Sequence, residues 1–486
     1  MKKSVKRLLS LVCVVAIGAT MMTSCKKNPA DQTSSDDYEI EYIYESEETG
    51  GNETEANAST NQNTNSDSSN TTSGKKPTAS TGNTGTSGGN DLSKYKGTTV
   101  TYATWIDPTK AEEAAAIKKF EKETGMKFKY MNVPQGEYIN TIIGKMQSGS
   151  APDVVFDNGY FPASLNILQP ISAAGTVDLS DPLWDQSYLK HFTFKGEVYE
   201  LSSVSNFWAE TKVLFYNKSL FKTAGVPTPE ELYNQGNWTW ESLGNLMKMY
   251  TESPNKPKGT IAMSAVSPGA MLESIGCGFF VYDEQTATIK NGTSDPLCIQ
   301  ALTKLCEWNK LGYSTGAGDG FINGKSAMTP GGCYGLRKKG QFKRMANQSD
   351  IGFVRMPTYD ANSKRVYTYG PRGQGICKGS KNPGGAGIFL KYYLDPANYD
   401  YASEYISNDA LNFFREITAE KAASDNTFFS IYNGVMAANG LEGNGVDYWM
   451  FVTTDPTQVQ NQLNSMKNVN NARAAETTKV LQNAIK

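Results

Sequence analysis

The sequence predicts an α/β protein with two lobes, each built on a doubly wound sheet flanked by helices. Strand and helix patterns alternate between Thr99 and Phe156, which is typical of a mainly parallel sheet with helical connections. The part of the chain from about Leu92 to Lys486 is also much longer than one typical domain. This length favours two lobes over one.

The first predicted strand is Thr99–Trp105, a stretch rich in β-forming residues. Asp107 and Pro108 follow it, and they suit a helix cap and the first turn of a helix. The helix expected after them spaces its apolar side chains for one inward face. It ends at Gly125, where a left-handed cap is expected.

A second strand and a second helix are predicted at Lys127–Val133 and Glu137–Gln147. The apolar run Pro152–Phe156 then has the pattern of a buried third strand. Three strands separated by two helices complete the signature of a doubly wound lobe.

Polar and aromatic side chains follow two of these strands. Trp105 and Asp107 come after the first strand, and Asp157, Asn158 and Tyr160 come after the third. Ligands of such sheets bind beyond the carboxyl ends of the strands. We therefore expect these five residues at a ligand site, although Asp107 also suits a simple helix cap.

The N-terminus has the features of an export signal. The sequence MKKSVKR precedes a mostly apolar run, Leu8–Met22, which is too short to span a bilayer comfortably. The run ends in Met22-Thr23-Ser24-Cys25, which resembles the lipobox of bacterial lipoproteins. This resemblance predicts a signal peptide at 1–24 and a lipid on Cys25.

Residues 25–91 are expected to form a disordered tether. An acidic stretch is followed by Ser, Thr, Asn and Gly almost without interruption, so the segment has too little apolar surface to offset the entropy of ordering. A flexible chain of about 65 residues has a root-mean-square reach of roughly 45 Å. The tether would hold the folded part of the chain clear of the membrane.

Composition excludes several classes of function. The net charge is −2, and no Lys/Arg cluster occurs outside the signal peptide, so a nucleic-acid partner is not expected. The single histidine, His191 in a loop-like stretch, excludes a histidine-based triad and a multi-histidine metal site. Gly324-Lys325-Ser326 lacks the glycine that a phosphate-binding loop requires, because Asp319 stands there. No cofactor and no metal are expected.

Six segments of the body follow one another in the order and spacing of a known family. They are FEKETG (Phe120–Gly125), SGSAPDVVF (Ser148–Phe156), the segment Leu214–Leu243, FINGKSAM (Phe321–Met328), IGFVRMP (Ile351–Pro357) and the segment Gly373–Leu394. With them the chain resembles the family 1 extracellular solute-binding proteins, which are receptors of ATP-driven importers and include the maltose-binding protein. The segment GGCYGL (Gly331–Leu336) departs from the family pattern, because Tyr334 stands where relatives often place a tryptophan.

The resemblance implies a periplasmic-binding-protein-like fold of two lobes joined by crossing segments. The N-terminal lobe would hold 92–203 and 318–369, the C-terminal lobe would hold 214–317 and 373–486, and the hinge crossings would fall at 204–213, 315–320 and 370–375. Glycines are frequent in the last two crossings, as suits segments that absorb backbone rotation.

The resemblance also implies a function without covalent chemistry. A carbohydrate would bind between the lobes and be delivered to permease subunits that work with a separate ATPase. The protein would be a monomer, anchored through Cys25 at the outer face of the cytoplasmic membrane. Aromatic faces and polar groups are the side chains that bind sugars. Those expected here are Trp105, Asp107, Asp157, Asn158, Tyr160, Trp208, Glu210, Tyr334, Arg372 and Trp449.

Trp238, Trp240 and Trp308 are expected in the core. A receptor of the same fold for peptides, polyamines or phosphate remains an alternative, as does a surface protein that holds a polysaccharide. A glycosidase that uses Asp157 and Glu210 is a further alternative, since such enzymes need only two carboxylates at a fixed separation.

Overall fold

The computed structural model describes residues 92–204, 211–264, 268–315, 320–398, 404–441 and 455–484. The predicted signal peptide, Cys25 and the tether lie outside the described residues, as do Trp208, Glu210 and Trp449. None of the described helices combines the length and the apolar character that crossing a membrane requires.

The first sheet has five strands in the order β2-β1-β3-β15-β4. β1 (Thr99–Thr104) pairs in parallel with β2 (Lys127–Asn132) and with β3 (Val154–Phe156). β15 (Gln374–Cys377) runs antiparallel between β3 and β4 (Leu168–Gln169). The three parallel strands are those predicted from the sequence, with slightly shifted ends, and this part of the prediction is confirmed.

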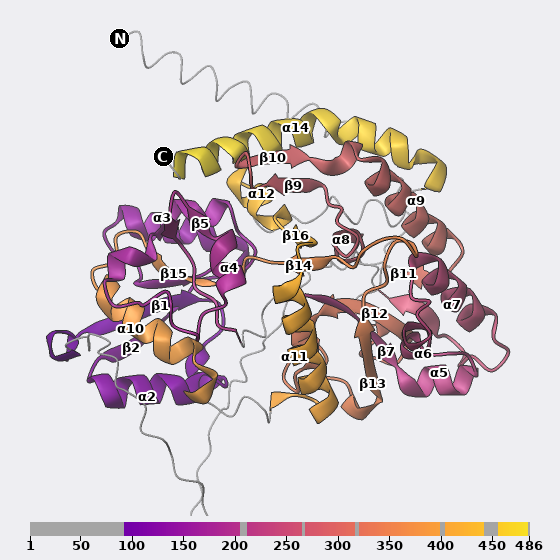
Figure 1. Ribbon diagram of the computed structural model, residues 1–486, viewed down its shortest axis with the longest axis horizontal. Coiled ribbons are helices and arrows are strands. Elements are labelled where there is room, and N and C mark those ends of the chain that lie inside the picture. Colours follow the sequence, from indigo (N-terminus) through magenta and orange to yellow (C-terminus); the bar gives the residue numbers. More distant parts are fainter. Residues whose placement is uncertain are drawn as a thin grey trace, which may run out of the picture. The chain divides into compact units, whose positions relative to one another are not determined.

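Helices α2 (Ala114–Thr124), α3 (Tyr138–Gln147) and α10 (Pro383–Leu394) belong to this first lobe. α10 packs against α2 and β1 (Figure 1). α2 ends at Gly125, which has a φ of 69°. Only glycine adopts this left-handed conformation without strain, and it closes the helix as predicted.

The helix expected directly after Asp107 is divided in the structure. Asp107 caps a short 3-10 helix, Pro108–Lys110, and its carboxylate accepts a hydrogen bond from the N–H of Thr109. α2 begins only at Ala114. The capping pattern was therefore correct, but it belongs to a single turn that precedes the helix.

The second sheet also has five strands, in the order β11-β8-β12-β7-β13. β7 pairs antiparallel with both β12 and β13, whereas β8 pairs in parallel with β11 and β12. The strands are β7 (Lys212–Asn217), β8 (Ile261–Ser264), β11 (Ser314–Thr315), β12 (Ser326–Gly332) and β13 (Ile351–Arg355).

The remaining elements lie around these two sheets. α14 lies along β10 of a two-stranded hairpin (Figure 1). The helices are α4 (Gln186–His191), α5 (Lys218–Ala224), α6 (Pro229–Asn234), α7 (Trp240–Glu252), α8 (Pro268–Glu273), α9 (Pro296–Lys310), α11 (Asn408–Ala423), α12 (Tyr432–Ala438) and α14 (Val459–Ala484). The short strands are β5 (Thr193–Phe194), β6 (Glu197–Val198), β9 (Phe280–Asp283), β10 (Thr288–Asn291), β14 (Tyr367–Tyr369) and β16 (Thr427–Phe429).

The predicted division of the chain between the lobes is wrong in its second half. Residues 318–369 were expected in the first lobe, but β12 and β13 pair with β7 in the second sheet. Residues after 373 were expected in the second lobe, but β15 and α10 belong to the first. β12 and β15 are mostly buried strands, and burial does not by itself specify which partner a strand pairs with.

The crossing predicted at 315–320 is wrong for the same reason, because β11 and β12 flank it and belong to one sheet. Leu201 still belongs to the first lobe, because it forms a β-bridge with Gln374. The chain passes from the first sheet to the second between Leu201 and the start of β7. It returns between β14 and β15, and passes over again between α10 and α11. The first two passages coincide with the segments 204–213 and 370–375.

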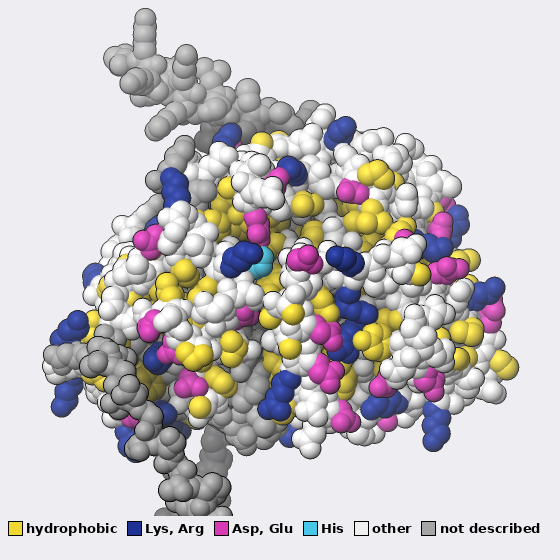
Figure 2. Space-filling view, viewed as in Figure 1, with side chains coloured by type: hydrophobic (Ala, Val, Ile, Leu, Met, Phe, Trp, Pro, Cys, Tyr) yellow, Lys and Arg dark blue, Asp and Glu magenta, His cyan; other side chains and the backbone are white. Residues whose placement is uncertain are grey.

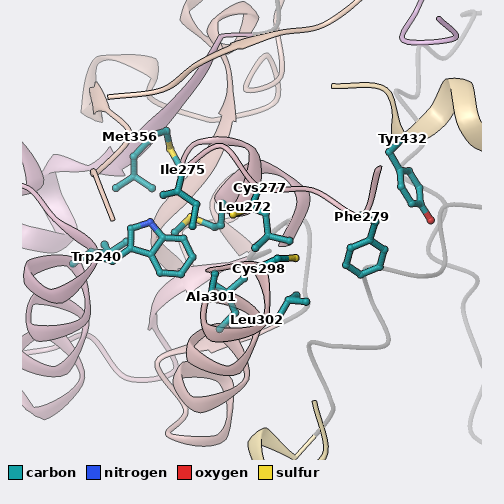
Figure 3. Close-up of a cluster of buried hydrophobic side chains, with 14 of the residues drawn as sticks. Trp240, Leu272, Ile275, Cys277, Phe279, Cys298, Ala301, Leu302, Met356 and Tyr432 are labelled. Carbon is teal, nitrogen blue, oxygen red and sulfur yellow. The ribbon is translucent and has the colours of Figure 1, made fainter. Parts of the chain in front are cut away.

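The second lobe has a large apolar core, shown in part in Figure 3. Trp238, Trp240 and Trp308 are all buried, which confirms the prediction that they are core residues. The rings of Trp240 and Trp308 lie 5.4 Å apart. Cys277 and Cys298 lie among apolar side chains in Figure 3, and burial raises the pKa of the Cys277 thiol to about 12. The cysteines of the described chain are buried and free, as expected.

An aromatic contact joins the two lobes on one side. Phe161 of the first lobe lies 5.4 Å from Tyr282 and 5.6 Å from Phe429, both in the second lobe. The 3-10 helix Ala163–Asn166 continues this contact against α12 and α14. The apolar core is therefore continuous from one lobe to the other here.

Gly434 in α12 has no room for a side chain, because a Cβ there would lie 1.8 Å from the carbonyl oxygen of Phe161. We expect Gly434→Ala to lower the free energy of unfolding by about 1–3 kcal/mol through overpacking at the contact between the lobes. Urea denaturation measures this change.

Gly144→Ala is the matched control, because Gly144 lies inside α3 and a Cβ added there would meet no atom within 4 Å. That change should raise stability slightly through helix propensity. Equal effects of the two substitutions would show that the lobes are not packed closely at Gly434.

Candidate functional site

The loop after β3 is bound to the passage that leads into β15. The N–H of Asp157 donates to the carbonyl of Gly373 over 2.9 Å, and the N–H of Gly159 donates to the carbonyl of Pro371 over 2.7 Å. Asp157, Asn158 and Arg372, three of the predicted ligand-binding residues, are thus brought together at the carboxyl end of the first sheet. This is the position at which such sheets bind ligands.

Glu200 and Tyr188 lie beneath this loop and were not predicted. The hydroxyl of Tyr188 donates to Glu200 Oε2 over 2.8 Å and accepts the backbone N–H of Arg372 over 3.0 Å. Glu200 is fully buried. Burial raises the pKa of its carboxyl well above the ordinary value, and the neighbouring charge of Asp157 raises it further. A glutamate inside the otherwise apolar VYEL stretch was the one signal available in the sequence.

Several buried oxygens around this loop have no hydrogen-bond partner. They are Asp157 Oδ2, Asn158 Oδ1, Glu200 Oε1 and Gln374 Oε1, and each of these residues is at most 4% exposed. Orphaned buried acceptors are costly, so their concentration in one place points to protons or bound polar groups. The cluster can accept hydrogen bonds from hydroxyl donors.

The residues predicted after β1 serve mainly to build the lobe. The ring of Trp105 lies 5.7 Å from that of Tyr138, edge to face, and 5.3 Å from that of Phe156. Asp107 accepts from both the N–H and the hydroxyl of Thr109. The capping role of Asp107 is therefore observed, and both side chains remain partly exposed.

Tyr160 lies in the core of the first lobe and is 5% exposed. Its ring stacks on Tyr138 with centroids 5.7 Å apart, and its hydroxyl donates to the carbonyl of Gln135 over 2.5 Å. Little of its surface is left for a ligand. Its backbone N–H donates to Asp157 Oδ1 over 2.5 Å, so Tyr160 contributes to the site by holding that carboxylate.

A cluster of charged groups connects the lobes near the start of α2. Arg337 of the second lobe lies 3.5 Å from the carboxylate of Glu112 in the first lobe and 3.7 Å from that of Glu404. Lys339 lies 3.9 Å from Glu112. Burial acts to raise the pKa of Glu112, but the charges of Arg337 and Lys339 and the hydrogen bonds to its carboxylate together leave that pKa below the ordinary value. Tyr334 precedes Arg337 and packs partly buried on the second-lobe core.

His191 forms a second polar contact between the lobes. It ends helix α4 and is not in a loop as expected, and its Nδ1 lies 2.5 Å from Glu284 Oε1 of the second lobe. The ring packs 4.6 Å from that of Tyr369. In Figure 2 the imidazole reaches the surface beside acidic and basic side chains.

A pocket of about 540 Å³ also lies between the lobes. The first lobe contributes Asp185, Val204, Pro396 and Ala397 to its wall. The second lobe contributes one face of α11, with Phe414, Arg415, Thr418, Ala419 and Ala422. None of the predicted site residues that the structure describes lines this pocket. Val204 begins the first passage between the lobes, so the pocket lies beside that passage.

A comparison of the sequence with models of known protein families shows to which family this chain belongs. The sequence model of the bacterial extracellular solute-binding proteins matches residues 102–400, which is more than half of the chain. The chain belongs to this family. A sequence search of curated proteins returned no match.

Solved structures of this family resemble the chain in fold. The GacH receptor of Streptomyces glaucescens, studied unliganded and with acarbose, has a TM-score of 0.54 and 19% identity, over 80% of this chain and 98% of the other. An ABC substrate-binding protein of Listeria monocytogenes in complex with cycloalternan has a TM-score of 0.55 and 17% identity, over 77% and 99%. The extracellular solute-binding protein of Staphylococcus aureus with maltose has a TM-score of 0.52 and 18% identity, over 77% and 99%. The predicted two-lobed fold is confirmed.

The described residues contain no group of three or more His, Cys, Asp or Glu side chains placed to hold a metal ion.

Glu113, which lies beside the charged cluster, should make the stability of the protein depend on pH. Burial, together with the charge of Glu112, raises the pKa of Glu113 to about 7. An acid with a raised pKa in the folded state stabilises the fold below its unfolded pKa, and this stability is lost as pH rises through the folded pKa. Glu113 should therefore make the protein less stable at pH 8 than at pH 5, by about 3 kcal/mol.

Glu113→Gln should remove this part of the pH dependence, as measured by urea denaturation at the two pH values. Glu121→Gln, on an exposed position of α2, is the control and should leave the dependence as it is. An unchanged pH dependence in Glu113→Gln would contradict a protonated Glu113 in the folded protein.

Proposed function

We propose that this protein is the solute receptor of an ABC importer, and that it captures a sugar or oligosaccharide between its lobes and delivers it to the permease. Family membership is the observation that carries the proposal. The two lobes, connected by passages of chain with a pocket beside one of them, suit a protein that closes around a ligand. The lipid on Cys25 and the tether would keep this receptor at the membrane.

Two observations support a sugar as the ligand. Related folds are described with acarbose, cycloalternan and maltose. The chain also offers aromatic faces and buried polar acceptors near the carboxyl end of the first sheet, which are the groups that bind sugars. Trp105, Asp157, Asn158 and Arg372 would contribute from the first lobe and its passage. Tyr334 would face them from the second lobe, with Trp208, Glu210 and Trp449 completing the set.

The Glu112–Arg337 contact gives a physical reason for closure. It joins side chains of different lobes, so it exists only while the lobes are close together. A ligand shifts the balance between open and closed states by its differential affinity for them. A contact present only in the closed state adds to that difference.

A thermal-shift screen tests the proposed ligand class. The panel contains maltose, maltotetraose, raffinose and cellobiose, with free amino acids, short peptides and spermidine as the non-sugar arm. A ligand at one hundred times its Kd should stabilise the protein by about 2.7 kcal/mol, which raises the melting temperature clearly. We expect this rise with one class of carbohydrate, and chromatography should return that sugar unchanged.

A rise with peptides or spermidine alone would overturn the sugar and keep the receptor. Cleaved sugar in the mixture would contradict a receptor and favour a glycosidase.

A double-mutant cycle tests the closure contact. Glu112→Gln and Arg337→Gln should each weaken binding of the sugar found in the screen, and together they should weaken it by less than the sum. The expected coupling is about 1 kcal/mol, or roughly a fivefold change in Kd. Isothermal titration calorimetry measures the four affinities.

Lys310 and Asp455 provide the control pair, because they form an exposed contact of 2.8 Å within the second lobe. Their neutral variants should leave the affinity unchanged. Strictly additive effects at Glu112 and Arg337 would show that their contact does not distinguish the closed state from the open one.

A further inference from the structure

Asp157 and Glu200 form a buried pair of carboxyl groups. Asp157 is 3% exposed and Glu200 is fully buried. Both lie against Gly373, whose carbonyl accepts the N–H of Asp157 and on which a Cβ would lie 2.8 Å from Glu200 Oε2, and each carboxyl group shifts the pKa of the other. One oxygen of each already accepts a hydrogen bond: Asp157 Oδ1 from Tyr160 and Glu200 Oε2 from Tyr188. The other oxygen of each, Oδ2 and Oε1, has no donor.

One proton shared by Asp157 and Glu200 would satisfy both unpartnered carboxyl oxygens. Two ionised carboxylates side by side and away from water repel each other, and neither can donate to the other. A single proton turns one group into a donor and satisfies both empty oxygens. The other titratable or charged groups that face the pair are Tyr188 from α4 and Arg372 from the passage before β15. With one proton the pair carries a single negative charge opposite Arg372.

The pair also lies where three segments of chain meet. Asp157 belongs to the loop after β3, Glu200 precedes the bridge of Leu201 to Gln374, and Tyr188 binds the backbone of Arg372. A Cβ on Gly373 would lie 2.6 Å from the Tyr188 hydroxyl and 2.8 Å from Glu200 Oε2. The carboxyl groups are therefore packed directly against the backbone of the passage.

We propose that Asp157 and Glu200 share one proton, and that Glu200 is a positioning residue that holds the loop after β3 on the passage between the lobes. The inference rests on the proposed function in taking this loop as part of the ligand site. Loss of the proton places two like charges in contact, and the loop then separates from the passage. Burial, together with the charge of Asp157, raises the pKa of Glu200 well above its ordinary value, so the separation is expected as pH rises through that raised pKa.

Hydrogen exchange of the ligand-free protein tests the positioning role. The amides of Asp157 and Gly159 report on it, because they bond to the carbonyls of Gly373 and Pro371. Between pH 6 and pH 9 these amides should lose protection in the wild type, after correction for intrinsic exchange. Glu200→Gln, which is neutral and can still donate, should keep them protected throughout. Glu200→Ala should lower protection on the order of tenfold or more at every pH, because buried acceptors lose their donor.

The stability of the same variants tests the proton. The measurement uses a Glu113→Gln background, since Glu113 also titrates in this range. An acid with a raised folded pKa contributes stability that is lost as pH rises through that pKa. One shared proton should change the unfolding equilibrium constant up to tenfold per pH unit. Glu200→Gln should remove this slope.

Two results would overturn the proposal. Equal protection in Glu200→Gln and Glu200→Ala would mean that the residue only fills space. An unchanged pH slope in Glu200→Gln would mean that no proton is shared. If Glu200→Ala does not fold, the comparison of wild type with Glu200→Gln across pH decides alone.

Titration with maltotetraose at pH 7 connects the pair to binding. Affinity should be kept in Glu200→Gln and fall about tenfold in Glu200→Ala, in line with the lost buried hydrogen bond. Equal affinities in the two variants would contradict the positioning role. Failure of the wild type to bind any sugar would count against the proposed function alone, because the exchange and stability measurements need no ligand.

Discussion

The first sheet is completed by β15, a strand that comes after all the strands of the second sheet in the sequence. β15 inserts antiparallel between β3 and β4, and all of its residues are buried. This pairing brings the carbonyls of Pro371 and Gly373 to the amides of the loop after β3. The candidate site is therefore held by the passage between the lobes, and a movement of the passage is felt directly at the site.

The contacts between the lobes are of two physical kinds. Around Phe161 and Phe429 they are aromatic and continuous with the core, and separating them would expose a large apolar surface to water. Around Glu112 and Arg337 they are ionic, and charges that separate regain hydration that offsets much of the lost attraction. We infer that the aromatic side stays closed as the hinge and that the ionic side opens.

Sequence patterns predicted the features that depend on neighbouring residues in the chain, such as strands, helices and their buried faces. The alternation of strands and helices up to Phe156 and the burial of Trp308 followed from side-chain periodicity, whereas the burial of Trp238 and Trp240 was expected from the family resemblance. Sequence patterns did not show to which lobe β12 and β15 belong. Both are short buried segments, and the strands with which they pair lie far away in the chain. Asp157 and Arg372 were found as candidates, whereas Glu200 was missed because a glutamate in a strand-like stretch usually faces water. The cap pattern of Asp107 was read correctly, yet periodicity could not tell that it serves a single turn.

Small-angle X-ray scattering with and without the best sugar of the screen tests the central claim most directly. A receptor that closes around its ligand should show a smaller radius of gyration when the sugar is saturating, and Arg337→Gln should weaken this compaction. A bound sugar that leaves the radius of gyration unchanged would contradict closure between the lobes.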